Sequence, residues 1–251
     1  MKFVTVKSKH LKGRGDITLF EPKGNFEAGL PVVTLLHGVY GSHWAWAYSG
    51  GAHRVAQRLI DEGVIEPMVL AMPSDGLFGD GSSYTAHNGC DYERWIVDDV
   101  FQAACEVSEW VDDTSPRFIA GLSMGGYGAL RLGARNAHVF SSISGHSSIT
   151  RFTEHEQFLE EPLEALHPAE QYEDLDVIGA LRAHAAALPP LRFDCGTGDP
   201  LIEGNRLLHQ QLDEDGIPHV YEEFPGAHTW EYWHEHLADS LRFFSRAAAG
   251  R

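Results

Sequence analysis

The chain has 251 residues, a formal net charge of −17 at pH 7 and a hydrophobic fraction of 43%. This length and composition suit a folded protein with a substantial core and exclude global disorder. The acidic balance would repel phosphate backbones and anionic lipid headgroups, so we expect neither nucleic acid nor a membrane as a partner. The three cysteines include no Cys-x-x-Cys pair, so they predict neither a disulfide framework nor a zinc or redox motif.

The first residues carry no recognisable secretory leader. Residues 1–16 contain several lysines, but no apolar stretch follows them. No apolar run approaches the ~20 residues of a membrane span. We therefore expect a soluble, cytoplasmic protein, and the sequence leaves open whether it forms a homo-oligomer.

Strand and helix patterns alternate along the whole chain. This alternation predicts an α/β fold, with a mostly parallel central sheet of about eight strands and helices on both faces. The expected strands are Phe3–Val6, Asp16–Phe20, Pro31–Leu36, Pro67–Met72, Arg117–Leu122, Val139–Ser144, Leu191–Cys195 and His219–Phe224. The expected helices are Ala52–Ile60, Tyr92–Val111, Gly125–Arg135, Asn205–Leu212 and Trp230–Phe244.

One segment interrupts this alternation. Residues 145–190 are irregular and acidic, so we expect a single domain over residues 1–251 with an insertion at this point. The insertion either caps the functional site or forms a solvated surface excursion. Its acidic residues include Glu154, Glu156, Glu160, Glu161, Glu164, Glu170, Glu173 and Asp174.

A Gly-x-Ser-x-Gly pentapeptide, residues 121–125, stands between an expected strand and an expected helix. At such a sharp turn the serine is held in a strained backbone conformation and its hydroxyl is exposed above the sheet. Side chains two residues before and after the serine would collide, and Gly121 and Gly125 occupy these positions. The context predicts Ser123 as a catalytic nucleophile.

A serine nucleophile needs a base, and the base needs an orienting carboxylate. In strand–turn–helix serine hydrolases, the chain order is serine, acid, histidine. Asp199 follows the expected strand 191–195 within a Gly-Thr-Gly-Asp loop, so we predict it as the acid. Asp194 lies within the strand and would point into packing, and Glu203 is a more distant third candidate.

The base is predicted from position rather than from residue type, because the chain contains 15 histidines. His228 follows the last expected strand and a Pro-Gly turn, directly before the closing helix. His234 and His236 lie inside that helix on different faces, which disfavours both a catalytic role and a zinc site there. The predicted site contains no metal and needs no cofactor.

Acyl transfer creates an oxyanion that two backbone N–H groups usually stabilise. We predict one donor at Met124, directly after the nucleophile, and the other at Val39, in a Gly-containing loop after the third strand. Gly38 and Tyr40 are the neighbouring alternatives for the second donor. His37 is expected to be a structural hydrogen-bonding residue rather than a second base.

Aromatic side chains flank the oxyanion loop and the predicted base. They either line an acyl or alcohol pocket or pack the loop and the closing helix. They are Tyr40, Trp44, Trp46, Trp230, Tyr232 and Trp233. For substrate contact we name Gly38, Tyr40 and Trp44. The Gly-rich loop 75–90 should border the site, with Tyr84 and His87 as further contacts.

Four strings, GLSMGGYGAL, LLHGVYGSHWAW, DCGTGD and PGAHTWEYW, together resemble the esterase D-like branch of the α/β-hydrolases. This branch includes tributyrin, feruloyl and acetylxylan esterases, S-formylglutathione hydrolases and mycolyltransferases. The resemblance extends over residues 31–244. It implies a triad of Ser123, Asp199 and His228, an oxyanion donor at Val39 and a small-molecule ester substrate.

The expected activity is therefore hydrolysis of short-chain acyl or small aryl-acyl esters through an acyl-enzyme. An acyltransferase would use the same triad, and a thioester hydrolase of the S-formylglutathione type is a further alternative. Those thioesterases carry a cysteine shortly after the oxyanion glycine, and residues 39–43 contain none. A non-catalytic binding protein is a remote alternative, because all three triad positions are filled.

Overall fold

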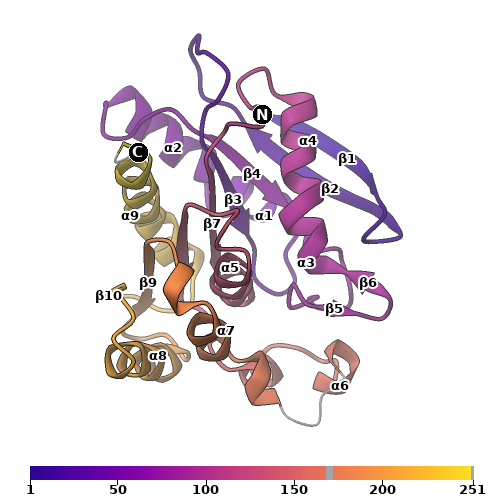
Figure 1. Cartoon of the computed structure of the whole chain (residues 1–251), viewed down its shortest axis with the longest axis vertical. Helices are drawn as coiled ribbons and strands as arrows, with labels where there is room; N and C mark the ends of the chain where they lie inside the picture. Colours follow the sequence, from indigo (N-terminus) through magenta and orange to yellow (C-terminus); the bar gives the residue numbers. More distant parts are fainter. Residues whose placement is uncertain (168–171, 250–251) are drawn as a thin grey trace.

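The computed structural model describes residues 1–167 and 172–249, and a twisted sheet runs through its middle (Figure 1). The strand order in the eight-stranded sheet is β1-β2-β4-β3-β7-β8-β9-β10. These strands are β1 (Lys2–Ser8), β2 (Gly13–Phe20), β3 (Val32–Leu36), β4 (Val69–Pro73), β7 (Arg117–Leu122), β8 (Ser142–His146), β9 (Leu191–Gly196) and β10 (Val220–Phe224). Each predicted strand overlaps one of them, and β5 (Ala86–His87) and β6 (Cys90–Asp91) form a separate small ribbon.

The sheet is antiparallel only at its first edge. β1 pairs with β2 and β2 with β4 in antiparallel fashion, whereas every pair from β4 to β10 is parallel. Leu36 therefore lies beside Gly121 at the carboxyl ends of β3 and β7, and Leu122 lies beside His146. The loops that follow these strands meet at one edge of the sheet, where sites in open α/β sheets form.

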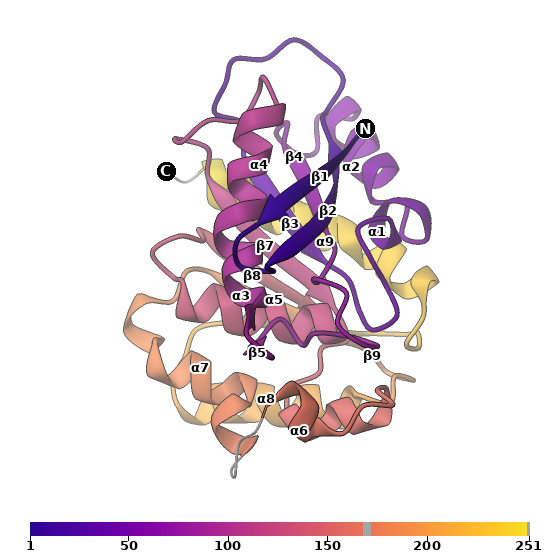
Figure 2. The same cartoon turned by 90° about the vertical axis from the view of Figure 1, so that its right-hand side faces the viewer.

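Helices cover both faces of the sheet, as predicted (Figures 1 and 2). One face packs against α1 (Ala45–Tyr48), α2 (Ala52–Asp61) and α9 (Trp230–Ala249). The other packs against α4 (Val100–Val107), α5 (Met124–Arg135) and α8 (Ile202–Glu214). Along β7, Phe118 and Ala120 belong to the first core and Ile119 to the second, because successive strand residues point to opposite faces.

The predicted helix 92–111 is shorter and less regular than expected. It consists of α3 (Tyr92–Arg94), a π-helical turn over Trp95–Asp99, and α4, which ends at Val107. Ser108 adopts an extended conformation with ψ 132°, and its hydroxyl donates to the Glu21 carboxylate. A side chain that leaves the helix to bond elsewhere ends the regular pattern. Val111 is still buried, but it lies outside the helix.

The insertion lies between β8 and β9. It contains 3₁₀ turns at Phe152–Gln157, Tyr172–Leu175 and Ala185–Ala187, and the helices α6 (Leu163–Leu166) and α7 (Val177–Ala183). α6, α7 and α8 gather at one end of the molecule in both views (Figures 1 and 2). Glu170, one of its expected acidic residues, lies outside the described residues.

Several hydrogen bonds tie the insertion to the loop that follows β4, and the Asp80 N–H donates to the Glu161 carboxylate at 3.2 Å. The Glu160 backbone N–H donates to the Asp80 carboxylate at 2.9 Å, and Asn88 donates to the Ala165 carbonyl at 3.1 Å. The insertion is therefore held against residues 75–90 rather than projecting away from them. No helix among the described residues has the length and apolar character needed to cross a bilayer.

Candidate active site

Ser123 stands at the turn between β7 and α5, in the conformation that the sequence predicts. Its φ is 54° and its ψ is −120°, a combination that is strained for a residue with a side chain. A methyl group on Gly121 would collide with the Gly125 carbonyl, and one on Gly125 would collide with the Leu36 carbonyl. Two glycines are therefore required for the turn to close. The Ser123 backbone N–H donates to the His146 carbonyl at 3.0 Å, which fixes the turn against β8.

The structure brings Ser123, His228 and Asp199 together in one hydrogen-bond chain. His228 Nε2 lies 3.0 Å from Ser123 Oγ, and His228 Nδ1 lies 2.8 Å from Asp199 Oδ2. The Asp199 side chain is fully buried, and its other oxygen accepts the Leu201 N–H at 2.8 Å. This carboxylate therefore has a fixed orientation and holds one ring nitrogen, while the other ring nitrogen faces the serine.

The loops that carry the acid and the base are joined to each other. Thr197 N–H donates to the Phe224 carbonyl at 2.8 Å, and Gly198 N–H donates to the Gly226 carbonyl at 2.7 Å. These bonds continue the parallel β9–β10 pairing beyond the ends of both strands. Asp199 and His228, which are 29 residues apart in the sequence, are thereby held in contact.

Ser123 and His228 form part of the wall of a cavity of about 420 Å³. Its walls come from the loop after β3, the start of α9 and the insertion. The lining comprises Gly38, Val39, Tyr40, Gly41, Ala45, Leu122, Ser123, Phe158, His228, Thr229, Trp230, Glu231 and Trp233. Of the three residues predicted to contact substrate, Gly38 and Tyr40 are in this lining.

Trp44, the third residue predicted to contact substrate, is not among the residues that line this cavity. Its side chain is 42% exposed and is not part of the described lining, whereas its neighbour Ala45 is buried and does line the cavity. Trp44 immediately precedes α1, where consecutive residues point in different directions. Proximity to the oxyanion loop in the sequence therefore did not place this ring on the cavity side.

The other aromatic candidates divide between lining and packing. Trp230 and Trp233 line the cavity with Tyr40. Trp46 is buried and donates its indole N–H to the Leu36 carbonyl, and Tyr232 is buried with its hydroxyl on Asp194. In the loop after β4, Tyr84 donates to the His37 carbonyl and His87 contacts the Ser82 carbonyl, so neither lines the cavity.

Two backbone N–H groups are available where the sequence predicts an oxyanion hole. Met124 is the first residue of α5, where an N–H has no partner within the helix. Val39 N–H donates to no oxygen among the described residues, whereas Tyr40 N–H is engaged by the Asp80 carbonyl at 2.8 Å. The Tyr40 alternative is therefore removed.

His37 holds the loop after β3, where the oxyanion donor is predicted, in place. Its Nδ1 lies 2.6 Å from the Gly38 carbonyl, and its Nε2 accepts the Asp75 N–H at 3.1 Å. The ring is buried and is not among the residues that line the cavity, which matches its expected structural role. It joins the loop after β3 to the loop after β4.

Phe158, from the insertion, is a cavity residue that the sequence does not indicate. Its ring stacks on His228 with centroids 5.4 Å apart, and Trp233 meets the same imidazole edge-on at 4.9 Å. The Tyr40 hydroxyl donates to the Phe158 carbonyl, which links the insertion to the oxyanion loop. Partial burial and then the charges of Asp80 and Glu160 raise the Tyr40 pKa, so this phenol stays neutral. No motif precedes Phe158, so only the fold could reveal it.

A second serine, histidine and aspartate lie together in the core, where Ser240 of α9 meets His146 of β8 and Asp194 of β9. Ser240 Oγ is 2.7 Å from His146 Nε2, and His146 Nδ1 is 2.8 Å from Asp194 Oδ2. All three side chains are fully buried, and Arg192 contacts both Ser240 Oγ and Asp194 Oδ2 at 2.9 Å. Burial raises the Asp194 pKa, but His146, Arg192 and Tyr232 together lower it further, so the pKa lies below its usual value.

Comparison with known proteins supports the same chemistry. The family model described as "Putative esterase" matches residues 8–244. An acetyl esterase from Caldicellulosiruptor saccharolyticus is 25% identical over 236 residues, which cover 87% of this chain and 85% of the relative.

Two solved structures have closely similar backbones. A ferulic acid esterase superposes with a TM-score of 0.84 and 27% identity, covering 98% of this chain and 97% of the other. The fluorophosphonate-binding serine hydrolase FphF of Staphylococcus aureus superposes with a TM-score of 0.83 and 20% identity, covering 97% of each chain. The chain therefore belongs to this esterase family and is a serine esterase with the α/β-hydrolase fold.

Proposed function

We propose that Ser123, His228 and Asp199 are the catalytic triad of this esterase. The observation that carries the proposal is the hydrogen-bond chain from Asp199 through His228 to Ser123, which ends at a cavity wall. His228 takes the serine proton as Ser123 Oγ attacks the ester carbonyl, and Asp199 stabilises the imidazolium that forms. His228 then protonates the leaving alcohol, and water repeats the cycle on the acyl-enzyme.

The tetrahedral intermediates place negative charge on the former carbonyl oxygen. The N–H groups of Met124 and Val39 are the proposed donors to this oxygen, and Gly38 N–H is the neighbouring alternative to Val39. The start of α5 adds the positive end of a helix dipole at the same point. Because loss of one such donor costs about 10²–10³ in rate elsewhere, this pair would supply a large share of catalysis.

The proposed substrates are esters with a short or small aryl acyl group. The cavity has room for a small acyl chain or one aromatic ring, and Phe158, Trp230 and Trp233 give it aromatic walls. Both ends of this range occur among relatives, as an acetyl esterase and a ferulic acid esterase. A panel of nitrophenyl esters of increasing chain length, with cinnamoyl and acetylated-sugar esters, would rank these groups.

A serine-directed fluorophosphonate tests the nucleophile directly. We expect one adduct per chain by intact mass, located at Ser123 by peptide mapping and missing from Ser123→Ala. Ser147, a buried serine that is not in the cavity lining, provides the matched control, and Ser147→Ala should still be labelled. Stoichiometric labelling of Ser123→Ala would refute the assignment.

A second experiment distinguishes a hydrolase from an acyltransferase. Analysis of the products of a reporter ester in the presence of excess alcohol shows whether water or the alcohol is the preferred acyl acceptor.

A further inference from the structure

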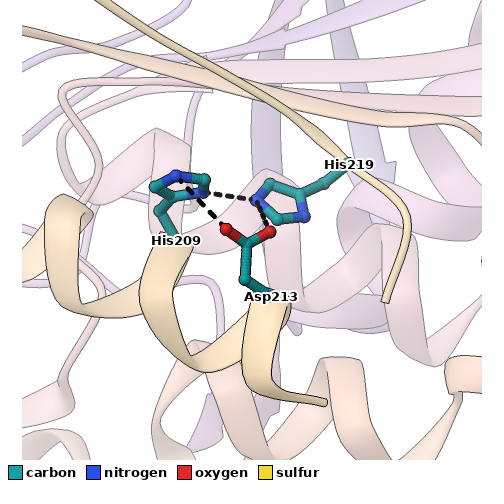
Figure 3. A group of neighbouring side chains, drawn as sticks. All are labelled: His209, Asp213 and His219. Carbon is teal, nitrogen blue, oxygen red and sulfur yellow. Dashed lines mark hydrogen bonds and ion pairs between the residues drawn. The ribbon is translucent and has the colours of Figure 1, made fainter. Parts of the chain in front are cut away.

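Two histidines and an aspartate converge at the surface where α8 turns back into β10 (Figure 3). His209 and Asp213 are one helical turn apart on α8, so they share a face. His219 directly precedes β10. One potential ligand atom from each side chain lies within 4.8 Å of the others. None of the three belongs to the lining of the esterase cavity.

His219 is held in the orientation of a metal ligand. Its Nδ1 donates to the Ile217 carbonyl at 2.8 Å, so Nε2 carries the lone pair and points at the other two residues. The ring stacks on Phe193 with centroids 5.7 Å apart, and its side chain is only 3% exposed. A backbone bond that fixes the tautomer of a ligating histidine is the usual support for a metal site.

The nitrogens of His209 and His219 and the Asp213 carboxylate have more lone pairs facing one another than N–H protons to fill them. His209 Nδ1 lies 2.7 Å from His219 Nε2, so one proton must bridge the two nitrogens when no other cation is present. If His209 is neutral and its one ring proton is on Nδ1, then Nε2 carries a lone pair, and this lone pair lies 3.6 Å from an Asp213 carboxylate oxygen. A divalent cation would take the place of the bridging proton, and that proton would move to His209 Nε2, facing the Asp213 carboxylate. His209 Nδ1, His219 Nε2 and an Asp213 oxygen would then each offer one lone pair to the ion.

The surroundings allow a cation to enter. Asp213 is 64% exposed and the His209 side chain 39%, so water can complete the coordination. The Tyr221 ring packs against His209 in a tilted arrangement, with centroids 4.8 Å apart. The nearby cation Arg206 is already paired with Glu203 and Glu223, at 2.7 Å in each case.

We propose that His209, Asp213 and His219 bind one divalent transition-metal ion of the zinc type, with water at the open position. Two imidazoles and one carboxylate favour such ions over Mg²⁺ or Ca²⁺, which prefer all-oxygen sites. Tetrahedral coordination with ~2.0–2.1 Å bonds sets the two nitrogens about 3.3 Å apart, so the half-exposed His209 ring moves back by about 0.6 Å. The ion would link the end of α8 to the start of β10.

Zn²⁺ titrated into chelator-treated protein, followed by calorimetry and metal analysis, tests the site. We expect one ion per chain in the wild type and at least a tenfold loss of affinity in both Asp213→Asn and His209→Gln. Both substituted side chains are partly or largely exposed, so these variants should fold normally. Because the ion binds only the folded state, a hundredfold excess over Kd should raise the wild-type Tm by about 5 °C.

Two control variants separate this site from the other histidines and acids. Glu214→Gln removes a carboxylate next to Asp213, and His138→Gln removes an exposed imidazole elsewhere. Both should bind Zn²⁺ within about twofold of the wild-type affinity, because neither residue belongs to the cluster. Absence of one-to-one binding in the wild type would overturn the proposal. Unchanged binding in Asp213→Asn and His209→Gln, or equal losses in the controls, would overturn it as well.

Discussion

Among the described residues, two hydrogen-bonded groups each contain a serine, a histidine and an aspartate, and their internal distances are nearly the same. In one, the two contacts are 3.0 and 2.8 Å, from Ser123 to His228 and on to Asp199. In the other they are 2.7 and 2.8 Å, from Ser240 to His146 and on to Asp194. Distances alone therefore do not distinguish a reactive group from a structural one.

The two groups differ in their access to solvent and in the backbone around the serine. Ser123 lies on a strained turn at a cavity wall, next to two available N–H groups. Ser240 lies inside a regular helix and is fully buried, with its hydroxyl in contact with Arg192. The second group can receive no ester, and its Arg192–Asp194 pair indicates a role in the core. Access and the available N–H groups are therefore our reasons for proposing Ser123, His228 and Asp199, rather than the buried group, as the catalytic triad.

Replacement of each serine gives the largest expected contrast. Ser123→Ala should lower kcat/KM by about 10⁴-fold or more, because the nucleophile is lost. Ser240→Ala should leave kcat/KM of the folded protein within about threefold of the wild-type value. Steady-state kinetics on a nitrophenyl ester, normalised to folded protein, measure both. Comparable losses in the two variants would remove the distinction between the groups.

Replacement of each aspartate should separate activity from stability. Asp199→Asn should reduce kcat by about 10³–10⁴-fold, because the imidazole loses the partner that fixes its tautomer. Asp194→Asn leaves Arg192 without its buried counter-charge and should lower the free energy of unfolding by about 3–5 kcal/mol. Denaturant unfolding and active-site-titrated kcat report the two quantities. A stable but inactive Asp194→Asn would contradict the structural role.

A third histidine, His155, extends the contrast between buried and accessible imidazoles. Burial lowers its pKa to about 4, from an unfolded value near 6.5. Between these values the unfolded state binds more protons, so stability rises with pH and is lost as pH falls from about 6.5 to 4. From pH 7 to pH 5 this group should cost about 2 kcal/mol.

The variant His155→Phe tests this pH dependence. The His155 ring packs against Tyr127 with centroids 4.9 Å apart, so an aromatic replacement retains the packing. The difference in free energy of unfolding between pH 7 and pH 5 should be about 2 kcal/mol smaller in the variant than in the wild type. Equal pH dependence in the two proteins would show that His155 does not contribute.

Replacement of Phe158 should have the smallest effect on catalysis, and it tests how the cavity wall contributes to substrate binding. Phe158→Ala removes an aromatic wall worth about 1 kcal/mol, so KM should rise about fivefold while kcat stays within about threefold. Phe101→Ala removes a ring on α4 that is not part of the cavity lining and should leave both constants unchanged. A fall in kcat without a rise in KM would instead show that Phe158 acts by orienting His228.

The sequence carries the information for local features of this site. The glycines at 121 and 125 define the turn around Ser123, and loops directly after strands β9 and β10 place Asp199 and His228. Parallel strands bring their carboxyl ends to one edge, so loops far apart in the chain meet there without further specification. For the same reason, the strand pattern was sufficient to predict the sheet.

Where no sequence motif marks a segment, only the tertiary structure shows which of its side chains contact other parts of the molecule. Trp44, which the sequence suggested, is outside the described cavity lining, and Phe158, which it did not suggest, is within it, because the direction of a side chain depends on packing rather than on proximity in the sequence. The sequence separates Asp199, in a loop, from Asp194, within a strand, but only the fold shows that Asp194 meets Arg192 and His146 in the core. His209, Asp213 and His219 likewise come together only where α8 turns into β10. Sequence patterns determine periodicity and turns, whereas long-range packing determines which side chains can reach one another and the solvent.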